Sequence, residues 1–170
     1  PKAGTSWSSQ VAFSSYFAKN GRCTQSGLRP WMKRSTNTFS VQNLGFGFTL
    51  YGKTYTQVTV NSNGYLHFEG PDDGYSDDNS TDVFLRNVRI APLWDNLDTG
   101  PAGGDVFVDR SVAGEIRFRW AAQRQGVLPA VPVNFAVTLF ADGTFRFDYG
   151  AGNTGLTPTV GVSGGNGLAF

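Results

Sequence analysis

The sequence predicts an all-β protein, an antiparallel β-sandwich of jelly-roll-like type with room for one short helix near the N-terminus. Three observations predict this fold class. Aromatic residues make up 14% of the 170 residues, glycine is abundant, and charged residues are only 16%, a composition that suits strands better than helices. Several short segments alternate apolar and polar residues. Asn-Gly and Asp-Gly pairs lie between such segments, which is typical of hairpin turns.

The first 35 residues show a less clear strand pattern than the rest of the sequence. We expect this segment (1–35) to pack on, or lead into, a domain at 36–170. Within it, "SSQVAFSSYFAKNG" (8–21) fits either a short helix that ends at Gly21 or an edge strand. Cys23 is the only cysteine, so no internal disulfide is possible. Its thiol is either a small buried side chain or is paired outside this sequence.

The next segments predict a first hairpin. "FGFTL" (46–50) ends at a Tyr-Gly turn, and "YTQVTVN" (55–61) and "YLHFE" (65–69) flank Asn63-Gly64. We expect Asn63-Gly64 to form a two-residue turn, because both residue types tolerate a positive φ.

The C-terminal half repeats this pattern. Ile116, Phe118 and Trp120 share one face of "EIRFRW" (115–120), and "PVNFAVTLF" (132–140) is joined through Asp142-Gly143 to "TFRFDYG" (144–150). "TVGVS" (159–163) is a last strand. Strands with one apolar face need a second sheet to cover that face, so the pattern predicts a sandwich with a second two-residue turn.

Charge is segregated along the chain. Residues 1–60 contain seven bases and no acid, whereas most of the acids fall within 61–110. The bases are scattered and form no compact patch, which argues against nucleic acid as a partner. The sequence has no apolar run long enough for a membrane span. Because it begins at Pro1, we expect a mature or excised piece of a larger protein.

The order of motifs resembles the nidogen-like extracellular domain. The resemblance is carried by "LGFGFTLYGKTYTQVTVNSNGYLHF" (44–68), "RIAPLWDNLDT" (89–99), "GDVFVD" (104–109), "NFAVTLFADGTFRFDYG" (134–150) and "TVGVSGGNG" (159–167), and it covers roughly 36–167. It implies a secreted or cell-surface β-rich module with a role in adhesion or matrix assembly, and the family offers no established catalytic residues. The single cysteine departs from the cysteine-rich animal members and favours a bacterial protein.

His67, the only histidine, is the first candidate for chemistry. Alternation places His67 with Tyr65 and Glu69, opposite Leu66 and Phe68, on what we predict to be the polar face of a half-buried strand. The sequence has no nucleophile motif such as Gly-x-Ser-x-Gly beside it. We therefore predict a scaffold histidine and no enzyme activity.

An acidic segment is the candidate metal site. "GPDDGYSDDNSTD" (70–82) combines carboxylates, amides and hydroxyls with glycine, and hard oxygen ligands on such a segment suit calcium. The predicted calcium ligands are Asp72, Asp73, Asp77, Asp78 and Asp82. The alternative is a solvated acidic loop. Asp95, Asp98 and Asp105 form a second, weaker candidate cluster.

Tyr75, Trp94 and Asp95 are the candidate ligand-binding residues, because an aromatic ring beside a carboxylate can stack on and hydrogen-bond a sugar. Trp94 could instead be a core side chain, and Asp95 and Asp98 could be turn-capping residues or, least favoured, a glycosidase pair.

The prediction is a non-catalytic extracellular binding or adhesion module of a larger secreted or cell-surface protein. Its partner would be a surface, a matrix component, a glycan or a neighbouring domain of that protein. The alternative is a carbohydrate-binding module attached to a secreted hydrolase.

Overall fold

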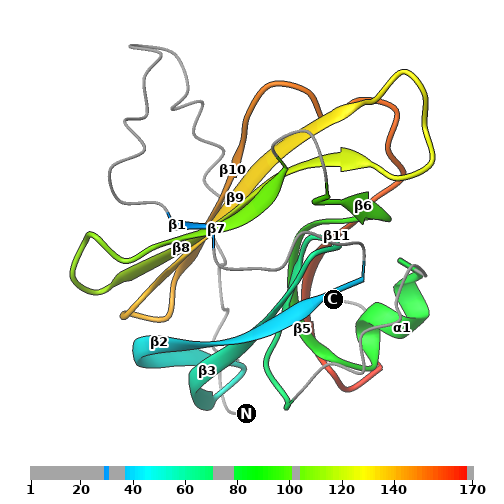
Figure 1. Ribbon diagram of the computed structural model, residues 1–170. Helices are drawn as coiled ribbons and strands as arrows, with labels where there is room; N and C mark the ends of the chain where they lie inside the picture. Colours follow the sequence, from blue (N-terminus) through cyan, green and yellow to red (C-terminus); the bar gives the residue numbers. More distant parts are fainter. Residues whose placement is uncertain (1–28, 31–36, 71–78, 101–103, 168–170) are drawn as a thin grey trace.

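Two antiparallel sheets pack face to face (Figure 1). The computed structural model of the chain describes residues 29–30, 37–70, 79–100 and 104–167. The five-stranded sheet has the order β11-β5-β4-β3-β2. Its strands are β2 (Phe39–Leu50), β3 (Lys53–Asn61), β4 (Tyr65–His67), β5 (Val88–Trp94) and β11 (Thr159–Gly164).

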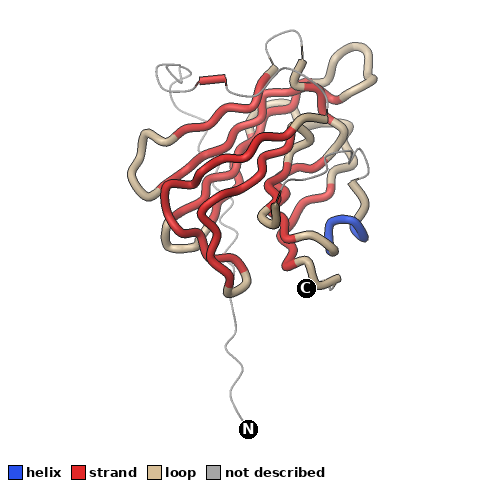
Figure 2. Tube along the Cα trace, turned by 60° about the horizontal axis from the view of Figure 1, so that its bottom comes forward, coloured by secondary structure: helices blue, strands red, loops and turns tan. Residues whose placement is uncertain are grey.

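The six-stranded sheet has the order β1-β7-β8-β9-β10, and β6 also pairs with β8. Its strands are β1 (Arg29–Pro30), β6 (Leu97–Asp98), β7 (Asp105–Asp109), β8 (Glu115–Arg124), β9 (Pro132–Phe140) and β10 (Phe145–Tyr149). The helix α1 (Thr81–Leu85) lies at the side of the sandwich (Figure 2).

The all-β sandwich predicted from the sequence is confirmed. The order of connections is simpler than a jelly roll, because consecutive strands are mostly neighbours within one sheet. The chain builds β2 to β5 as one meander, crosses to build β7 to β10 as another, and returns as β11 beside β5. The short helix predicted near the N-terminus falls on residues outside those that the structure describes.

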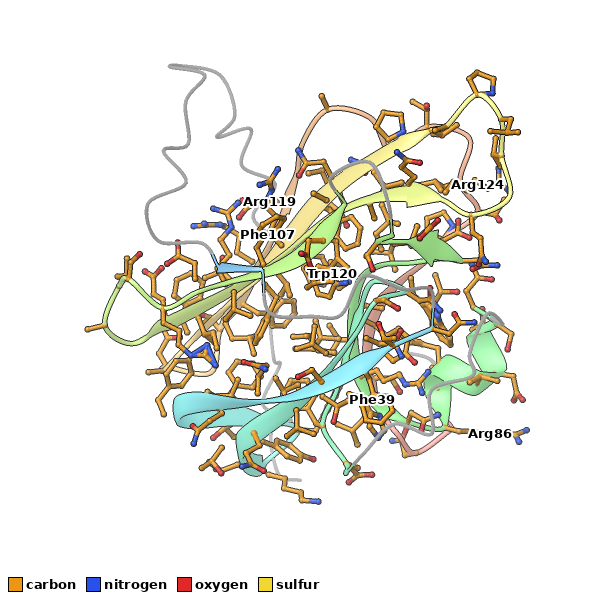
Figure 3. The ribbon with its side chains drawn as sticks, viewed as in Figure 1. Phe39, Arg86, Phe107, Arg119, Trp120 and Arg124 are labelled. Atoms are coloured by element: carbon orange, nitrogen blue, oxygen red, sulfur yellow. The ribbon has the colours of Figure 1, made fainter. Side chains whose placement is uncertain are left out.

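Large apolar side chains from both sheets fill the space between them. Trp120 and Phe135, on neighbouring strands of the six-stranded sheet, stack with ring centroids 5.0 Å apart. The Trp120 indole Nε1 donates to the carbonyl oxygen of Asn61 in the other sheet, at 2.8 Å. Figure 3 shows Trp120 beside the inner space and Phe107 and Arg119 together on the far side of their sheet. A buried indole keeps its hydrogen bond here by joining the two layers.

Both predicted hairpins are present, but each loop has three residues instead of two. Asn61 pairs with Tyr65, and the Gly64 amide donates to the Asn61 carbonyl oxygen at 3.2 Å. Gly64 has a φ of 90°, whereas Asn63 is not among the residues with positive φ. This is a turn of the ordinary hand followed by a left-handed glycine. Loop 141–143 has the same form, with Gly143 at a φ of 85° and its amide on the Phe140 carbonyl oxygen.

The hairpin loop 62–64 is buried and holds several elements together. Ser62 and Asn63 are both 0% exposed. The Asn63 side chain accepts from the Leu97 amide and donates to the Asn37 side chain, while its carbonyl accepts from the Asp95 amide. A Cβ on Gly64 would lie 2.0 Å from the Leu93 carbonyl oxygen. This loop therefore requires glycine both for its φ and for the close approach of another backbone.

Strand β5 contains no apolar-polar alternation, because all seven of its residues are buried. Its pairing with β11 shifts between Trp94–Thr159 and Ala91–Gly161, which leaves an extra residue on β5. Pro92 lies in this irregular stretch, where the absence of an amide hydrogen disturbs no regular ladder. The sequence of this segment matches a family motif, but its pattern did not predict a strand.

Candidate functional site

Helix α1 packs against β5 and β11 on the face of the five-stranded sheet that points away from the sandwich core. Tyr65, Phe84 and Trp94 form a second apolar cluster there, with Tyr65 and Trp94 rings 5.0 Å apart. The Arg89 guanidinium is buried and lies 4.4 Å from the centroid of the Tyr65 ring and 4.9 Å from that of Trp94. This part of the face is a closed structural cluster in which a cation is held against two rings.

Trp94 and Asp95, predicted as ligand-binding residues, have structural roles. Trp94 belongs to this cluster, and Asp95 follows it at the end of β5. Trp94 is 0% exposed, so its ring faces are not open to a sugar, which corrects that prediction. The two carboxylate oxygens of Asp95 accept from the backbone amides of Asn96 and Thr157, at 2.8 and 2.9 Å. The bond to Asn96 is the local capping that the turn alternative expected. The bond to Thr157 was not expected, and it holds the segment before β11 against the end of β5.

His67 does point to the face opposite Leu66 and Phe68, but the prediction that this face is polar and half exposed is wrong. His67 is 6% exposed, since β4 is a central strand and its neighbour in register on β5 is the buried Arg89. The imidazole Nε2 bonds the carbonyl oxygen of Glu69 at 3.0 Å. The His67 ring thus bonds the backbone of Glu69, whose carboxylate pairs with Lys53, and His67 shapes the bend that ends β4.

The predicted calcium ligands are largely beyond description. Asp72, Asp73, Asp77 and Asp78, with Tyr75, lie outside the residues that the structure describes. Asp82 lies in the first turn of α1 and forms an exposed ion pair with Arg86, with 2.8 Å between Oδ2 and Nη2. Across the described ranges, no group of three or more metal-ligating side chains comes together. Asp98 and Asp105 instead accept from the nearby backbone amides of Gly100 and Val106.

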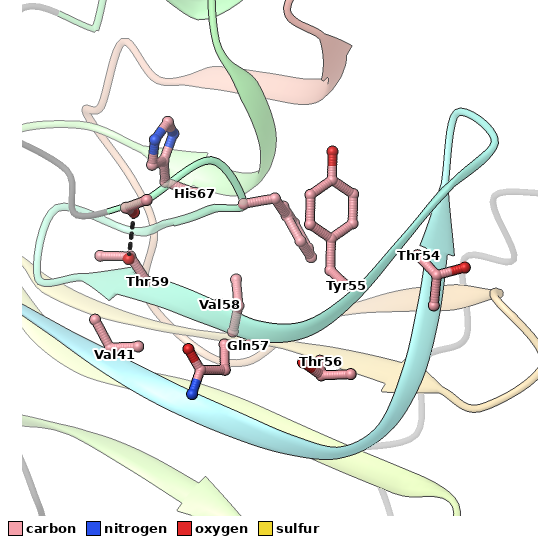
Figure 4. Close-up of a pocket in the computed structure, with 10 residues that line it drawn as sticks. Val41, Thr54, Tyr55, Thr56, Gln57, Val58, Thr59 and His67 are labelled. Atoms are coloured by element: carbon pink, nitrogen blue, oxygen red, sulfur yellow. Dashed lines mark hydrogen bonds between the residues drawn. The ribbon is translucent and has the colours of Figure 1, made fainter.

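A pocket of about 340 Å³ opens beside β3 (Figure 4). It is lined by the consecutive residues Thr54–Thr59 and by Val41, His67, Phe68 and Gly70. Tyr55 and Val58 are core residues, whereas Thr54, Thr56 and Gln57 are exposed. Side chains of a strand alternate between its faces, so a pocket lined by an unbroken run of one strand follows the edge of that strand.

Unequal strand lengths create this edge. Strand β3 has nine residues and β4 has three, and β4 pairs only with Thr59, Val60 and Asn61. After Phe68 the chain bends away, and the Thr59 hydroxyl donates to the Gly70 carbonyl oxygen at 2.8 Å (Figure 4). On the other side of β3, the pairing with β2 shifts between Asn43 and Phe48. Among the described strands, the first part of β3 therefore has no ladder partner on its β4 side.

Lys53 and Glu69 adjoin lining residues in the sequence, Lys53 before Thr54 and Glu69 between Phe68 and Gly70, and we call this pair the rim. Their side chains form an ion pair at 3.2 Å, and the hydrogen bond to Glu69 raises the pKa of the Lys53 ammonium. The ammonium also lies 5.1 Å from the centroid of the Tyr55 ring, and burial raises the pKa of the Tyr55 phenol. The rim therefore carries one charge of each sign, already engaged with each other.

This pocket was not predicted, since its lining residues match no sequence motif. The signal that could have found it is a difference in length. The alternating segment before Asn63-Gly64 is longer than the segment after it, which Gly70 and Pro71 interrupt. A long strand beside a short one leaves part of its edge unpaired.

Comparison with known proteins gives one family. The family model described as NIDO related matches residues 14–169. No curated protein and no solved structure matches the chain. In the part of the chain that the structure describes, no helix has the length and apolar character that crossing a membrane needs. The motifs of the two hairpins, the family match and the sandwich agree, and the chain belongs to the NIDO-related family.

Proposed function

We propose that this chain is a non-catalytic extracellular binding or adhesion module of a larger secreted or cell-surface protein. The observation that carries the proposal is the pocket beside β3, which opens on the surface of a domain from the NIDO-related family. Modules with this role need a rigid scaffold and an accessible recognition surface. The sandwich supplies the first, and the open edge of β3 supplies the second.

The placement of the titratable groups supports a role without turnover. His67, Asp95, Asp98 and Asp105 each bond the backbone within a few residues of their own position. Asp148 is 4% exposed, and its carboxylate accepts hydrogen bonds from both Nε and Nη2 of Arg146. Each of these groups holds the scaffold, which is the use that turn-capping and ion-paired carboxylates usually have.

The experiment is a binding assay with the purified domain. Immobilised matrix proteins, cell-wall material and cell-surface glycans are offered to the fluorescently labelled domain, and retention is measured against concentration. We expect saturable retention by one of these surfaces and no turnover of peptide, ester or glycoside substrates. Retention by none of them, or turnover of any substrate, would contradict the proposal. An antibody against the domain should also label intact cells of the source organism.

Calcium stabilisation is a separate part of the proposal that depends on the acidic segment 70–82. An ion that binds only the folded state stabilises it by about 2.7 kcal/mol at a hundredfold excess over its dissociation constant. We expect calcium, added after chelation, to raise the melting temperature, and Asp73→Asn combined with Asp77→Asn to abolish the rise. Equal melting temperatures with and without calcium would remove calcium from the proposal.

A further inference from the structure

We propose that the pocket beside β3 binds a neutral saccharide. This inference rests on the proposed function and adds the ligand class and the residues that recognise it. Its basis is the chemistry of the pocket wall, the open backbone edge of β3 and the balance of charge at the rim.

The wall offers hydrogen-bonding groups without net charge. Thr54, Thr56 and Gln57 are exposed residues of the pocket lining. The Thr54 hydroxyl already bonds the Thr49 hydroxyl at 3.0 Å. A threonine hydroxyl both donates and accepts, and a glutamine amide presents one acceptor and two donors. A saccharide ring displays hydroxyls that also donate and accept. This mixed set of neutral donors and acceptors therefore suits a saccharide better than an anion, because an anion only accepts hydrogen bonds.

The open edge of β3 adds backbone groups to this set. Since β4 pairs only with Thr59–Asn61, the part of β3 from Thr54 to Val58 has no ladder partner on that side among the described strands. Backbone amides and carbonyls alternate along such an edge. They provide further neutral donors and acceptors at fixed positions along the pocket.

An apolar surface lies next to these polar groups. Val41, on the neighbouring strand β2, lines the pocket and is 49% exposed. Phe68 and Tyr55 form the buried end, with ring centroids 5.2 Å apart. A sugar ring has an apolar C–H face as well as hydroxyls, so it can bury that face against Val41 while it hydrogen-bonds the opposite side.

The rim disfavours a charged ligand. Lys53 and Glu69 bind each other, and an anionic ligand would have to compete with the Glu69 carboxylate for the Lys53 ammonium. A cationic ligand would have to compete with the Lys53 ammonium for the Glu69 carboxylate. The walls are also held in place before any ligand binds, because the bond from Thr59 to Gly70 and the bond between His67 and Glu69 fix the bend. A site that is already ordered loses less entropy on binding.

The test compares a pocket variant with a matched control. The domain is screened on an array of neutral, sialylated and sulfated oligosaccharides, and the affinity for the best binder is measured by titration. Thr56→Val combined with Gln57→Leu removes a hydroxyl and an amide at exposed positions of the pocket. Thr154→Val combined with Gln123→Leu makes the same changes away from it. Melting temperatures establish that all three proteins are folded.

We expect neutral oligosaccharides to bind. The pocket variant should lose about tenfold or more in affinity, since tenfold is about 1.4 kcal/mol, the size of one or two lost hydrogen bonds. The control should bind like the parent, and amide resonances of 54–59 and 67–70 should shift on titration. Three outcomes would overturn the inference and leave the proposed function standing. They are binding only to charged glycans, an affinity of the pocket variant equal to that of the parent, and amide resonances that shift only when an extended peptide is added. Failure of the domain to bind any surface would overturn both.

Discussion

The hairpin loops 62–64 and 141–143 have the same length, the same turn hydrogen bond and a left-handed glycine at the same position. They differ in their surroundings. Ser62 and Asn63 are fully buried and bond two other segments, 37–38 and 95–97, whereas Ala141 and Asp142 are exposed. The Asp142 carboxylate accepts from the neighbouring Thr144 amide and hydroxyl, at 2.9 and 2.6 Å.

This difference separates two properties of a turn sequence. Asn-Gly and Asp-Gly specify the local conformation, and they do so equally well on the surface and in the interior. The contribution of the turn to the free energy of unfolding depends on which residues pack against it. Matched substitutions at the three positions of each loop therefore measure burial while conformation is held constant.

The glycine position should show the largest difference. Gly64→Ala places a Cβ 2.0 Å from the Leu93 carbonyl oxygen, whereas Gly143→Ala places it 3.3 Å from that of Thr49. Both changes cost about 1–2 kcal/mol for a left-handed residue, and Gly64→Ala adds about 1–3 kcal/mol for displaced backbone. Urea denaturation measures both free energies of unfolding. Equal losses at the two sites would show that backbone conformation alone governs them.

Exchanging the polar residues should give the next largest difference. Asn63→Asp puts a carboxylate at a position that is 0% exposed and removes the donor to Asn37, while Asp142→Asn keeps an acceptor for Thr144. Burial should raise the pKa of the new carboxyl in the folded state. Stability is then retained below the unfolded pKa and lost as pH rises above it, by about 1.4 kcal/mol per unit of pKa shift. Unfolding measured from pH 3 to 7 tests this, and a flat profile for Asn63→Asp would contradict it.

The first loop position should show a smaller effect. The Ser62 hydroxyl accepts from the Thr38 amide at 3.0 Å, so Ser62→Ala should cost about 1–3 kcal/mol by leaving that amide without its acceptor. Ala141→Ser, the reverse change at an exposed position, should stay within about 0.5 kcal/mol of the parent. Thermal unfolding of both variants provides the comparison. A loss at Ala141→Ser as large as that at Ser62→Ala would remove burial as the explanation.

The smallest expected effect is a pKa shift at the exposed loop. The hydrogen bonds from the Thr144 hydroxyl and amide lower the pKa of the Asp142 carboxyl from its ordinary value of 3.8. The deprotonated form is favoured in the folded state, so this contribution is present above that pH and is lost as pH falls through the lowered pKa. Thr144→Val should raise the pKa toward 3.8, which an NMR titration of the carboxyl carbon detects. An unchanged pKa would assign the shift to the backbone amide alone.

The sequence predicted those parts of the fold in which one face of a strand is polar. Strands β3, β8, β9 and β10 follow their alternating segments closely. Strand β5 was not predicted because it is buried on both faces and contains Pro92, so neither alternation nor strand propensity marks it.

Site residues were harder to predict, because exposure depends on distant segments. Alternation correctly separated His67 from Leu66 and Phe68, yet it could not show that the α1 side of the sheet is covered as well. The role of Trp94 was left open for the same reason, because Phe84 and Tyr65 reach it from other elements. The pocket beside β3 depends on where β4 ends, which is set by a bend and by no residue motif.

The return of β11 to the first sheet has a consequence for biosynthesis. Strand β5 emerges from the ribosome long before its partner β11, since Ile90 pairs with Val162. Until then, a strand that the folded protein buries completely has one unsatisfied edge, which is a template for joining other chains. Nascent chains that stop before residue 159 should therefore self-associate, whereas chains that include β11 should not. Strand β11 thus protects the five-stranded sheet from aggregation, because it pairs with the edge of β5 that is exposed during synthesis.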